Sequence, residues 1–117
     1  MVSSEDSYFD TDNICQQLTQ DHKPELKEEK LRITNKGGVV SKARDKHGKE
    51  YGPYRIWNKK MTNPGLAMSR SLGDGFAHTL GCSSEPEINQ YIIHPKDKIL
   101  VLGTDGIFEY LSNLEIG

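Results

Sequence analysis

The stretch over residues 98–111 constrains the fold of this chain more than any other. Four apolar residues at 99–102 form a run that is too short for a helix and rich in branched side chains, as is typical of a buried strand. Gly103 and Gly106 then break the pattern, and apolar residues return at a roughly helical spacing. The sequence therefore predicts a buried strand, a tight turn and the start of a helix.

Asp105 lies in that turn, and two interpretations of it stay open. A carboxylate that follows a buried strand and precedes a glycine is held rigidly, and oxygen-rich Mg²⁺ or Mn²⁺ sites need such a placement. Glu109 lies four residues further on, so a helical turn from Gly106 would bring its carboxylate toward the same space. The alternative is an Asx turn or a helix N-cap at Asp105, which the local sequence favours because Asp-Gly pairs are common in turns.

Composition and charge limit the size and partners of the chain. Its 117 residues, of which 34% are hydrophobic, allow one small domain at most. Residues 21–60 hold 12 basic and 6 acidic residues, whereas the remainder holds 3 basic and 11 acidic ones. A basic middle suits nucleic acid or an anionic phosphopeptide. Interleaved aromatic residues are absent over most of its length, so a solvated surface is favoured and no nucleic-acid partner is expected.

The two cysteines and the hydropathy indicate the compartment. Cys15 and Cys82 form no CxxC pair and have no histidine at a metal-binding spacing, so we expect free thiols in a reducing environment. No apolar run reaches the roughly 18 residues of a membrane span, and the N-terminus lacks the apolar core of a signal peptide. We expect an intracellular protein, cytoplasmic or nuclear, without a membrane partner.

The first half of the chain predicts one helix between less regular segments. Residues 1–12 are acidic and serine-rich and are interpreted as an irregular lead-in or cut end, and residues 14–19 suit a short strand. Residues 25–35 favour a helix that starts near Pro24 and stops at Gly37, with a narrow apolar stripe.

A polar segment follows this helix. A strand begins at Val39, and the composition of residues 41–63 predicts a long mobile loop or flap. Trp57 within it is either a contact residue or a peg that anchors the loop, and the peg is favoured.

Further along, a short buried strand is expected over residues 66–68, with Ser69 as the N-cap of a following helical turn. Asp74 lies between two glycines, where its carboxylate is expected to hold loop N–H groups. A helix is expected over residues 76–81. A second apolar segment at 88–93 predicts a strand that pairs with 99–102 through a hairpin turn at 95–98.

The last residues resemble the start of another helix. Ser112 and Glu115 have the spacing of a capping box, in which a serine N-cap is followed three residues later by a glutamate. The helix announced in this way has only one turn before Gly117, and one turn is not stable alone. The sequence therefore leads us to expect a truncated domain.

Four stretches, in this order, resemble the type 2C metal-dependent protein serine/threonine phosphatases. They are Leu-Thr-Gln-Asp-His-Lys-Pro at 18–24 with Glu29, Arg32, Ile33, Gly37 and Gly38; Gly-Leu-Ala-Met-Ser-Arg-Ser-Leu-Gly-Asp at 65–74; Glu-Pro-Glu-Ile at 85–88; and Asp-Lys-Ile-Leu-Val-Leu-Gly-Thr-Asp-Gly-Ile-Phe-Glu at 97–109. Together they cover most of residues 18–117. The segment Gly-Pro-Tyr-Arg-Ile-Trp at 52–57 looks like a variant of plant and protist members.

This resemblance implies a fold and a reaction. The fold class is α+β, and residues 13–117 would form part of a four-layer αββα sandwich with two antiparallel sheets. The implied activity is that of a phosphoric monoester hydrolase in which a metal-bridging hydroxide attacks phosphoserine or phosphothreonine, with two or more Mg²⁺ or Mn²⁺ ions as cofactors. The implied partner is a phosphoprotein substrate.

The resemblance also implies roles for particular residues. Asp105 matches a metal aspartate of the family, which favours the ligand interpretation over the cap, and Glu109 stands where the family has a second aspartate that serves a weaker metal site. Residues 39–64 correspond to a flap beside the active site, with Arg55, Trp57 and Lys59 as its substrate-facing residues. Five further residues belong to the matching structural motifs: Ser69, Arg70, Gly73, Asp74 and Gly106.

Several catalytic motifs of the family have no counterpart here. They are the early Asp-Gly-His-Gly-Gly motif, the upstream phosphate-binding arginine, the Gly-Asp-Ser-Arg strand and the late Asp-Asn metal ligand. We therefore expect a central-to-late part of a catalytic domain that is inactive alone and buries its uncovered apolar faces by self-association. The alternative is a non-catalytic pseudophosphatase or protein-interaction module.

Overall fold

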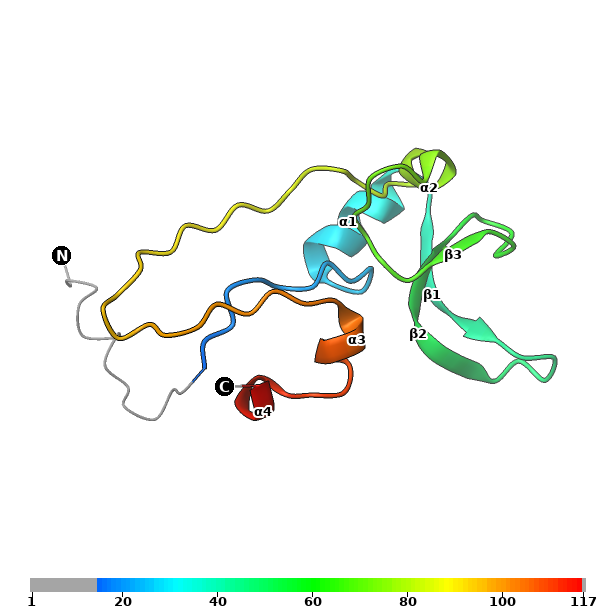
Figure 1. The fold of residues 1–117 in the computed structure, drawn as a ribbon. Helices are drawn as coiled ribbons and strands as arrows, with labels where there is room; N and C mark the ends of the chain where they lie inside the picture. Colours follow the sequence, from blue (N-terminus) through cyan, green and yellow to red (C-terminus); the bar gives the residue numbers. More distant parts are fainter. Residues whose placement is uncertain (1–14, 117) are drawn as a thin grey trace. The chain divides into compact units, whose positions relative to one another are not determined.

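The structure is a computed structural model that describes residues 15–116 (Figure 1). The chain divides into two units, which are Asp21–Ile88 and a second unit whose described residues are 15–20 and 89–116. Residues 1–12, predicted as a lead-in, lie outside the described residues. In the part of the chain that is described, no helix is long and apolar enough to cross a membrane.

Helix α1, Lys27–Asn35, confirms the helix predicted over 25–35 and begins two residues later. Pro24 and Glu25 form a turn instead. The stop at Gly37 is confirmed as well, since this residue has a φ of +86° and its N–H donates to Thr34 O over 3.0 Å. The buried positions of the helix are Glu29 and Ile33, so the side that packs is partly ionic and not simply an apolar stripe.

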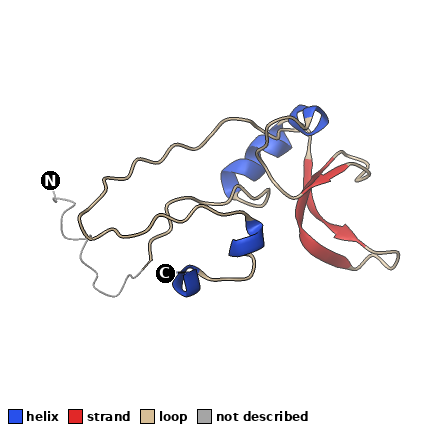
Figure 2. Cartoon of the chain, in the orientation of Figure 1, coloured by secondary structure: helices blue, strands red, loops and turns tan. Residues whose placement is uncertain are grey.

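A three-stranded antiparallel sheet occupies the segment predicted to be a loop (Figure 2). Its strands are β1 (Val39–Arg44), β2 (Glu50–Trp57) and β3 (Pro64–Leu66), in the order β1-β2-β3. The prediction of an irregular segment over 41–63 is therefore wrong. The polar residues form tight turns: Asp45 Oδ1 accepts hydrogen bonds from the His47 and Lys49 N–H groups over 2.8 and 3.0 Å and closes the β1–β2 hairpin.

The core of the Asp21–Ile88 unit is small and lies where α1, the sheet and α2 (Gly75–Thr79) meet. Ile33 from α1, Ile56 from β2 and Ala77 from α2 are buried together with Cys82, and Val40, Leu66 and Leu80 pack against them. Gly81 has a φ of +99°, and a Cβ on it would lie 2.7 Å from Ile33 Cα. Glycine at this position therefore lets the loop after α2 approach α1 closely.

The segment between β3 and α2 differs from its prediction in three ways. Strand β3 ends at Leu66, and Met68 is half-exposed instead of buried. Ser69 is not an N-cap, because its N–H donates to His22 O over 3.0 Å and the helix begins only at Gly75. Asp74 does turn the chain, with a φ of +46°, but its carboxylate caps no N–H group of α2.

In the second unit the predicted strands are not formed. Residues 89–93 and 99–102 have no strand partner in the described chain, and they are drawn as loop in Figure 2. Residues 15–19, expected to form a strand, are also irregular. The physical reason is that two strands without a third strand or a helix over their apolar face are marginal in water. The turn between them does form, with a hydrogen bond of 2.9 Å from Asp97 N to His94 O.

Two short helices complete the second unit: α3 (Asp105–Phe108) and α4 (Asn113–Ile116). The predicted capping box at the start of α4 is formed in part, because the glutamate reaches back to Ser112 N but the serine hydroxyl donates to that carboxylate instead of accepting from Glu115 N. Glu115 Oε2 accepts from Ser112 N over 2.7 Å and from Ser112 Oγ over 2.8 Å. Helices with an antiparallel sheet confirm the α+β class of the chain, while the two-sheet sandwich stays a prediction.

Candidate functional site

The turn that leads into α3 carries the predicted metal ligands. Thr104 is the N-cap, in an extended conformation, and its carbonyl accepts from Ile107 N over 3.0 Å. Asp105 is the first residue of the helix, so the interpretation of Asp105 itself as the N-cap is wrong. Its carboxylate is exposed in the first turn, where the positive end of the helix dipole favours negative charge.

The two glycines that flank this turn differ in how much space surrounds them. A Cβ on Gly103 would lie 2.9 Å from Phe108 Cε2 and 3.1 Å from Ile107 Cδ1, so the chain folds back closely over its own helix. A Cβ on Gly106 would meet only Thr104 Oγ1, at 3.5 Å, which is ordinary contact. A side chain at position 103 would therefore require the exposed Phe108 and Ile107 side chains to move, whereas one at position 106 would meet no close neighbour.

The geometry of α3 brings Asp105 and Glu109 to one side of the chain. Glu109 N donates to Asp105 O over 2.9 Å, which sets the two residues one helical turn apart, and both are exposed. A Mg²⁺ or Mn²⁺ ion takes about six oxygen ligands. No group of three or more histidine, cysteine or acidic side chains able to hold a metal occurs among the described residues. Those residues alone therefore do not fit a two-metal centre, and whether Asp105 and Glu109 are ligands stays a prediction.

A second cluster of charges lies inside the Asp21–Ile88 unit and is centred on Glu29. Arg32 donates to both Glu29 oxygens over 2.8 Å, and Arg70 Nη2 donates to Oε1 over 2.8 Å. Arg32 also donates from Nε to Gly81 O and from Nη2 to Ser69 O, each over 2.9 Å. This buried carboxylate and its two guanidinium groups therefore tie α1 to the segments before and after α2.

Two opposing effects set the pKa of Glu29. Burial of the carboxyl, which is only 3% exposed, raises its pKa, but the hydrogen bonds from Arg32 and Arg70 outweigh burial and hold the pKa well below its usual range. The nearby Ser69 hydroxyl also lowers the pKa of Glu29, although its Oγ makes no hydrogen bond of ordinary geometry. The same hydrogen bond to Glu29 holds the pKa of Arg70 above its ordinary value. Glu29 is thus ionised at neutral pH.

Glu29, Arg32 and Arg70 lie in the motifs that resemble the phosphatase family, but the sequence does not predict that both arginine side chains contact Glu29. The Glu29–Arg32 spacing of three residues is a recognisable helical pair. Arg70, however, is 41 residues away from Glu29, and no local pattern indicates that contact. Arg70 also donates from Nη1 to Glu85 O over 2.9 Å, which fixes the start of the Glu-Pro-Glu segment.

The residues predicted to face a substrate lie on the sheet and its last turn. Trp57 Nε1 donates to Ser41 O over 2.9 Å, and its ring lies over Gly65, where a Cβ would come within 3.0 Å of Trp57 Cζ3. The indole thus extends from β1 across β2 to β3, which confirms its interpretation as a peg. Arg55 Nη1 donates to Gly65 O over 2.6 Å, and Lys59 is exposed in the turn after β2.

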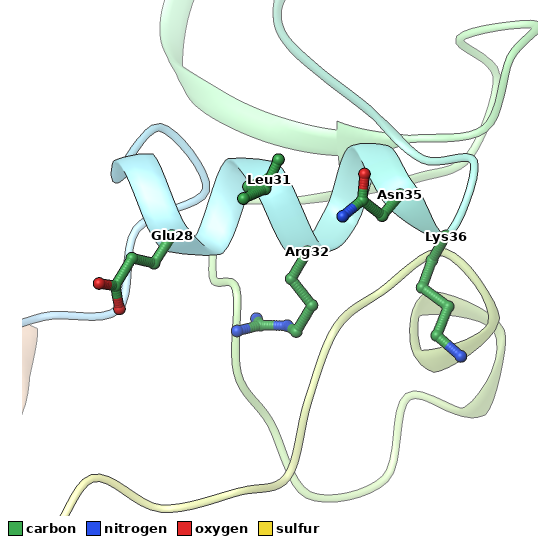
Figure 3. A pocket seen from close by; sticks show the side chains of 5 residues that line it. All are labelled: Glu28, Leu31, Arg32, Asn35 and Lys36. Carbon is green, nitrogen blue, oxygen red and sulfur yellow. The ribbon is translucent and has the colours of Figure 1, made fainter.

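The pockets of the described chain are shallow. One of about 370 Å³ is lined by five residues from α1 and its end, which Figure 3 shows on the surface of that helix: Glu28, Leu31, Arg32, Asn35 and Lys36. Another of about 200 Å³ lies beside His22 and Arg70. His22 Nε2 is 2.9 Å from Glu87 Oε2, and Arg70 is held by Glu29, so both of these groups are already paired. Neither pocket has the enclosure of an active site.

Comparisons with known proteins identify the family. Residues 2–116 match the family model described as Protein phosphatase 2C. The chain is 42% identical over 100 residues to probable protein phosphatase 2C 12 of Oryza sativa subsp. japonica, covering 86% of the chain and 25% of that relative. It is 41% identical over 102 residues to probable protein phosphatase 2C 73 of Arabidopsis thaliana, covering 87% of the chain and 26% of that relative.

This chain belongs to the protein phosphatase 2C family. It spans about a quarter of the length of the curated relatives it matches.

Proposed function

We propose that the protein is a metal-dependent protein serine/threonine phosphatase that hydrolyses phosphoserine and phosphothreonine in phosphoprotein substrates. The observation that carries this proposal is the family match over residues 2–116. It is supported by relatives that are named probable protein phosphatases and are 39–42% identical to this chain. We further propose Arg55, Trp57 and Lys59 as residues that face the substrate.

Mg²⁺ or Mn²⁺ is the proposed cofactor, with Asp105 as a direct ligand and Glu109 as a weaker one. Support comes from the oxygen chemistry of these side chains, from their exposure and from their separation by one helical turn. When bound, such ions neutralise phosphoryl oxygens and activate water. Two carboxylates supply too few ligands for two ions, so we propose that this chain alone has no appreciable phosphatase activity.

The proposed setting is a reducing intracellular compartment, cytoplasmic or nuclear. Both cysteines are free: Cys82 is buried with its Sγ 3.2 Å from Ser71 Oγ, and Cys15 is half-buried. A pair of unlinked thiols of this kind is usual in reducing surroundings.

Substitution of Asp105 in the complete protein tests the proposed function. Asp105→Asn keeps the size of the side chain and removes the charge that a hard cation needs, so we expect most of the Mn²⁺-dependent turnover of a phosphothreonine peptide to be lost. Because Asp105 is exposed, the thermal unfolding midpoint should stay within a few degrees of the wild type.

The matched control is Glu28→Gln, which removes an exposed carboxylate from α1 and should leave turnover unchanged. Unchanged turnover of Asp105→Asn at saturating metal would contradict the ligand assignment. A complete protein without any metal-dependent turnover would favour the non-catalytic interaction module instead.

A further inference from the structure

The β1–β2 hairpin and the turn that follows it concentrate positive charge. Residues 39–60 hold seven lysine and arginine residues and only two acidic ones. Both acidic side chains are engaged within the hairpin: Glu50 Oε1 is 2.9 Å from Arg44 Nη2, and Asp45 Oδ1 accepts the two backbone N–H groups of the hairpin turn. The hairpin therefore does not neutralise its own charge.

Six of these cations have no carboxylate at ion-pair distance among the described residues, and one of the six, Lys42, lies over the Tyr54 ring. We name the other five the hairpin cations: Lys46, Lys49, Arg55, Lys59 and Lys60. The four lysines are exposed and Arg55 is half-buried. Because like charges repel one another, such a group is favourable only where solvent or an anionic partner compensates it.

The hairpin cations are arranged along the length of β2. Lys46 and Lys49 lie in the turn that precedes Glu50–Trp57, and Lys59 and Lys60 lie in the turn that follows it. At about 3.3 Å per residue, the eight residues of the strand separate the two lysine pairs by roughly 26 Å. Arg55 lies between them in sequence, so the positive charges are spread along the strand and are not gathered at one end.

We propose that the hairpin cations bind an acidic, extended segment of the phosphoprotein substrate, away from the phosphorylated residue itself. This inference rests on the proposed phosphatase function and adds the class of substrate to it. An extended segment rises about 3.3 Å per residue, so about eight residues are needed to reach from one lysine pair to the other. The preferred segment thus has carboxylates near both ends.

The aromatic residues of the hairpin argue against single-stranded nucleic acid as the partner. Nucleic-acid surfaces of this size combine cations with ring faces on which bases stack. Here Lys42 Nζ lies 5.2 Å from the centroid of the Tyr54 ring, and the Trp57 ring packs over Gly65. Two of the three aromatic rings on β2 are therefore already engaged, whereas none of the hairpin cations is paired with a described carboxylate, although Arg55 donates to Gly65 O.

The experiment uses Trp57 as its probe, since it is the only tryptophan of the chain and lies within the hairpin. An unphosphorylated peptide of about ten residues, with three glutamates at each end, is titrated into the full chain while tryptophan emission is followed. We expect saturable binding that weakens as salt is raised from low to physiological concentration. A peptide of four glutamates, which reaches only one lysine pair, should bind about tenfold more weakly.

Charge reversal tests the position of the surface. The double variants Lys46→Glu/Lys49→Glu and Lys59→Glu/Lys60→Glu should each weaken binding of the long peptide by about tenfold or more. The control Lys27→Glu/Lys30→Glu makes the same change in net charge on α1 and should leave binding within about twofold. Urea unfolding of each variant confirms that the sheet is intact.

Three results would overturn the inference: equal binding of a matching lysine peptide, an equal loss in the α1 control, or tighter binding of an oligonucleotide of the same charge. The last would assign the surface to nucleic acid. Because the peptide is unphosphorylated and no turnover is measured, failure here leaves the phosphatase proposal standing. Loss of turnover in Asp105→Asn, conversely, has no effect on this binding.

Discussion

At the scale of single residues, Glu29 makes the most connections in the Asp21–Ile88 unit. Its carboxylate accepts hydrogen bonds from both Arg32 and Arg70, and these two side chains reach three backbone carbonyls beyond it. The hydrophobic core of the unit contains only four buried residues. Ionic and hydrogen-bonded contacts around Glu29 therefore supply part of the cohesion that a larger apolar core would otherwise give.

Replacement of Glu29 should reveal this contribution. Glu29→Gln removes the shared charge and leaves two guanidinium groups without a counter-ion, so we expect the free energy of unfolding to fall by about 3 kcal/mol, near the lower end for a broken buried pair. The lower end applies because the Arg32 and Arg70 side chains keep exposures of 30% and 23%. Urea unfolding monitored by Trp57 emission measures the change. An equal loss in Glu28→Gln, the exposed neighbour, would show that the pairing is not its cause.

The pH dependence of the same measurement has a defined sign. The pKa of Glu29 is lowered from an unfolded-state value near 4.5, so its contribution is fully present above that value and is lost as pH falls toward the folded-state pKa. Wild-type stability should therefore decline below about pH 5 more steeply than that of Glu29→Gln. Parallel stability curves for the two proteins between pH 6 and 3 would contradict the ionised pairing of Glu29.

At the scale of elements, composition is misleading for two segments. It predicts a loop where the β1–β2 hairpin forms, and a buried strand at 99–102, where the chain is irregular. Residues 41–63 are polar and glycine-containing, yet most of β1 and β2 is paired, from Val39↔Trp57 to Arg44↔Glu50. Residues 99–102 are apolar, yet they are irregular and exposed. We therefore expect residues 99–102, and not the mobile loop predicted over 41–63, to be the more mobile of the two segments.

Amide hydrogen exchange decides this point. We expect the paired amides of β1 and β2 to exchange more slowly than those of residues 99–102, because ladder hydrogen bonds must open first. The Lys46 amide, which is the one amide of the 46–49 turn with no hydrogen-bond acceptor among the described residues, serves as an internal reference within the hairpin. Faster exchange through β1 and β2 than through 99–102 would restore the original interpretation of a mobile loop.

Local signals were enough to predict α1, its stop at Gly37 and the return of the Glu115 carboxylate to Ser112 N, because each depends on residues within one or two turns. The break around Asp105 was predictable for the same reason. The hairpin was not predicted because its turn depends on the side chain of Asp45. This residue lies within a run of charged residues that is typical of a loop. The contact of Arg70 with Glu29 depends on residues that are distant in sequence, and so does strand formation by residues 99–102. Composition and periodicity do not predict such contacts.

At the scale of the whole molecule, apolar surface is unevenly covered. The Asp21–Ile88 unit buries its core under two helices, whereas the described residues of the second unit include no buried position. The uncovered apolar faces expected for a partial domain correspond to exposed side chains in the two segments predicted as strands: Ile88, Ile93, Ile99, Val101 and Leu102. Exposed apolar side chains, with unpaired backbone beside them, promote pairing with another chain.

Self-association is therefore the expected behaviour of this chain in solution. Ile99 and Leu102 are 82% and 86% exposed, so pairing of residues 99–102 with a second copy would remove them from water at about 25 cal/mol per Å² of apolar surface. Light scattering should show an apparent mass that rises with concentration, and Ile99→Lys/Leu102→Lys should keep the chain monomeric. Leu31→Lys alters a comparably exposed leucine on α1, at 61%, and should leave association unchanged. A wild-type chain that stays monomeric at all concentrations would show that this segment is not an association surface.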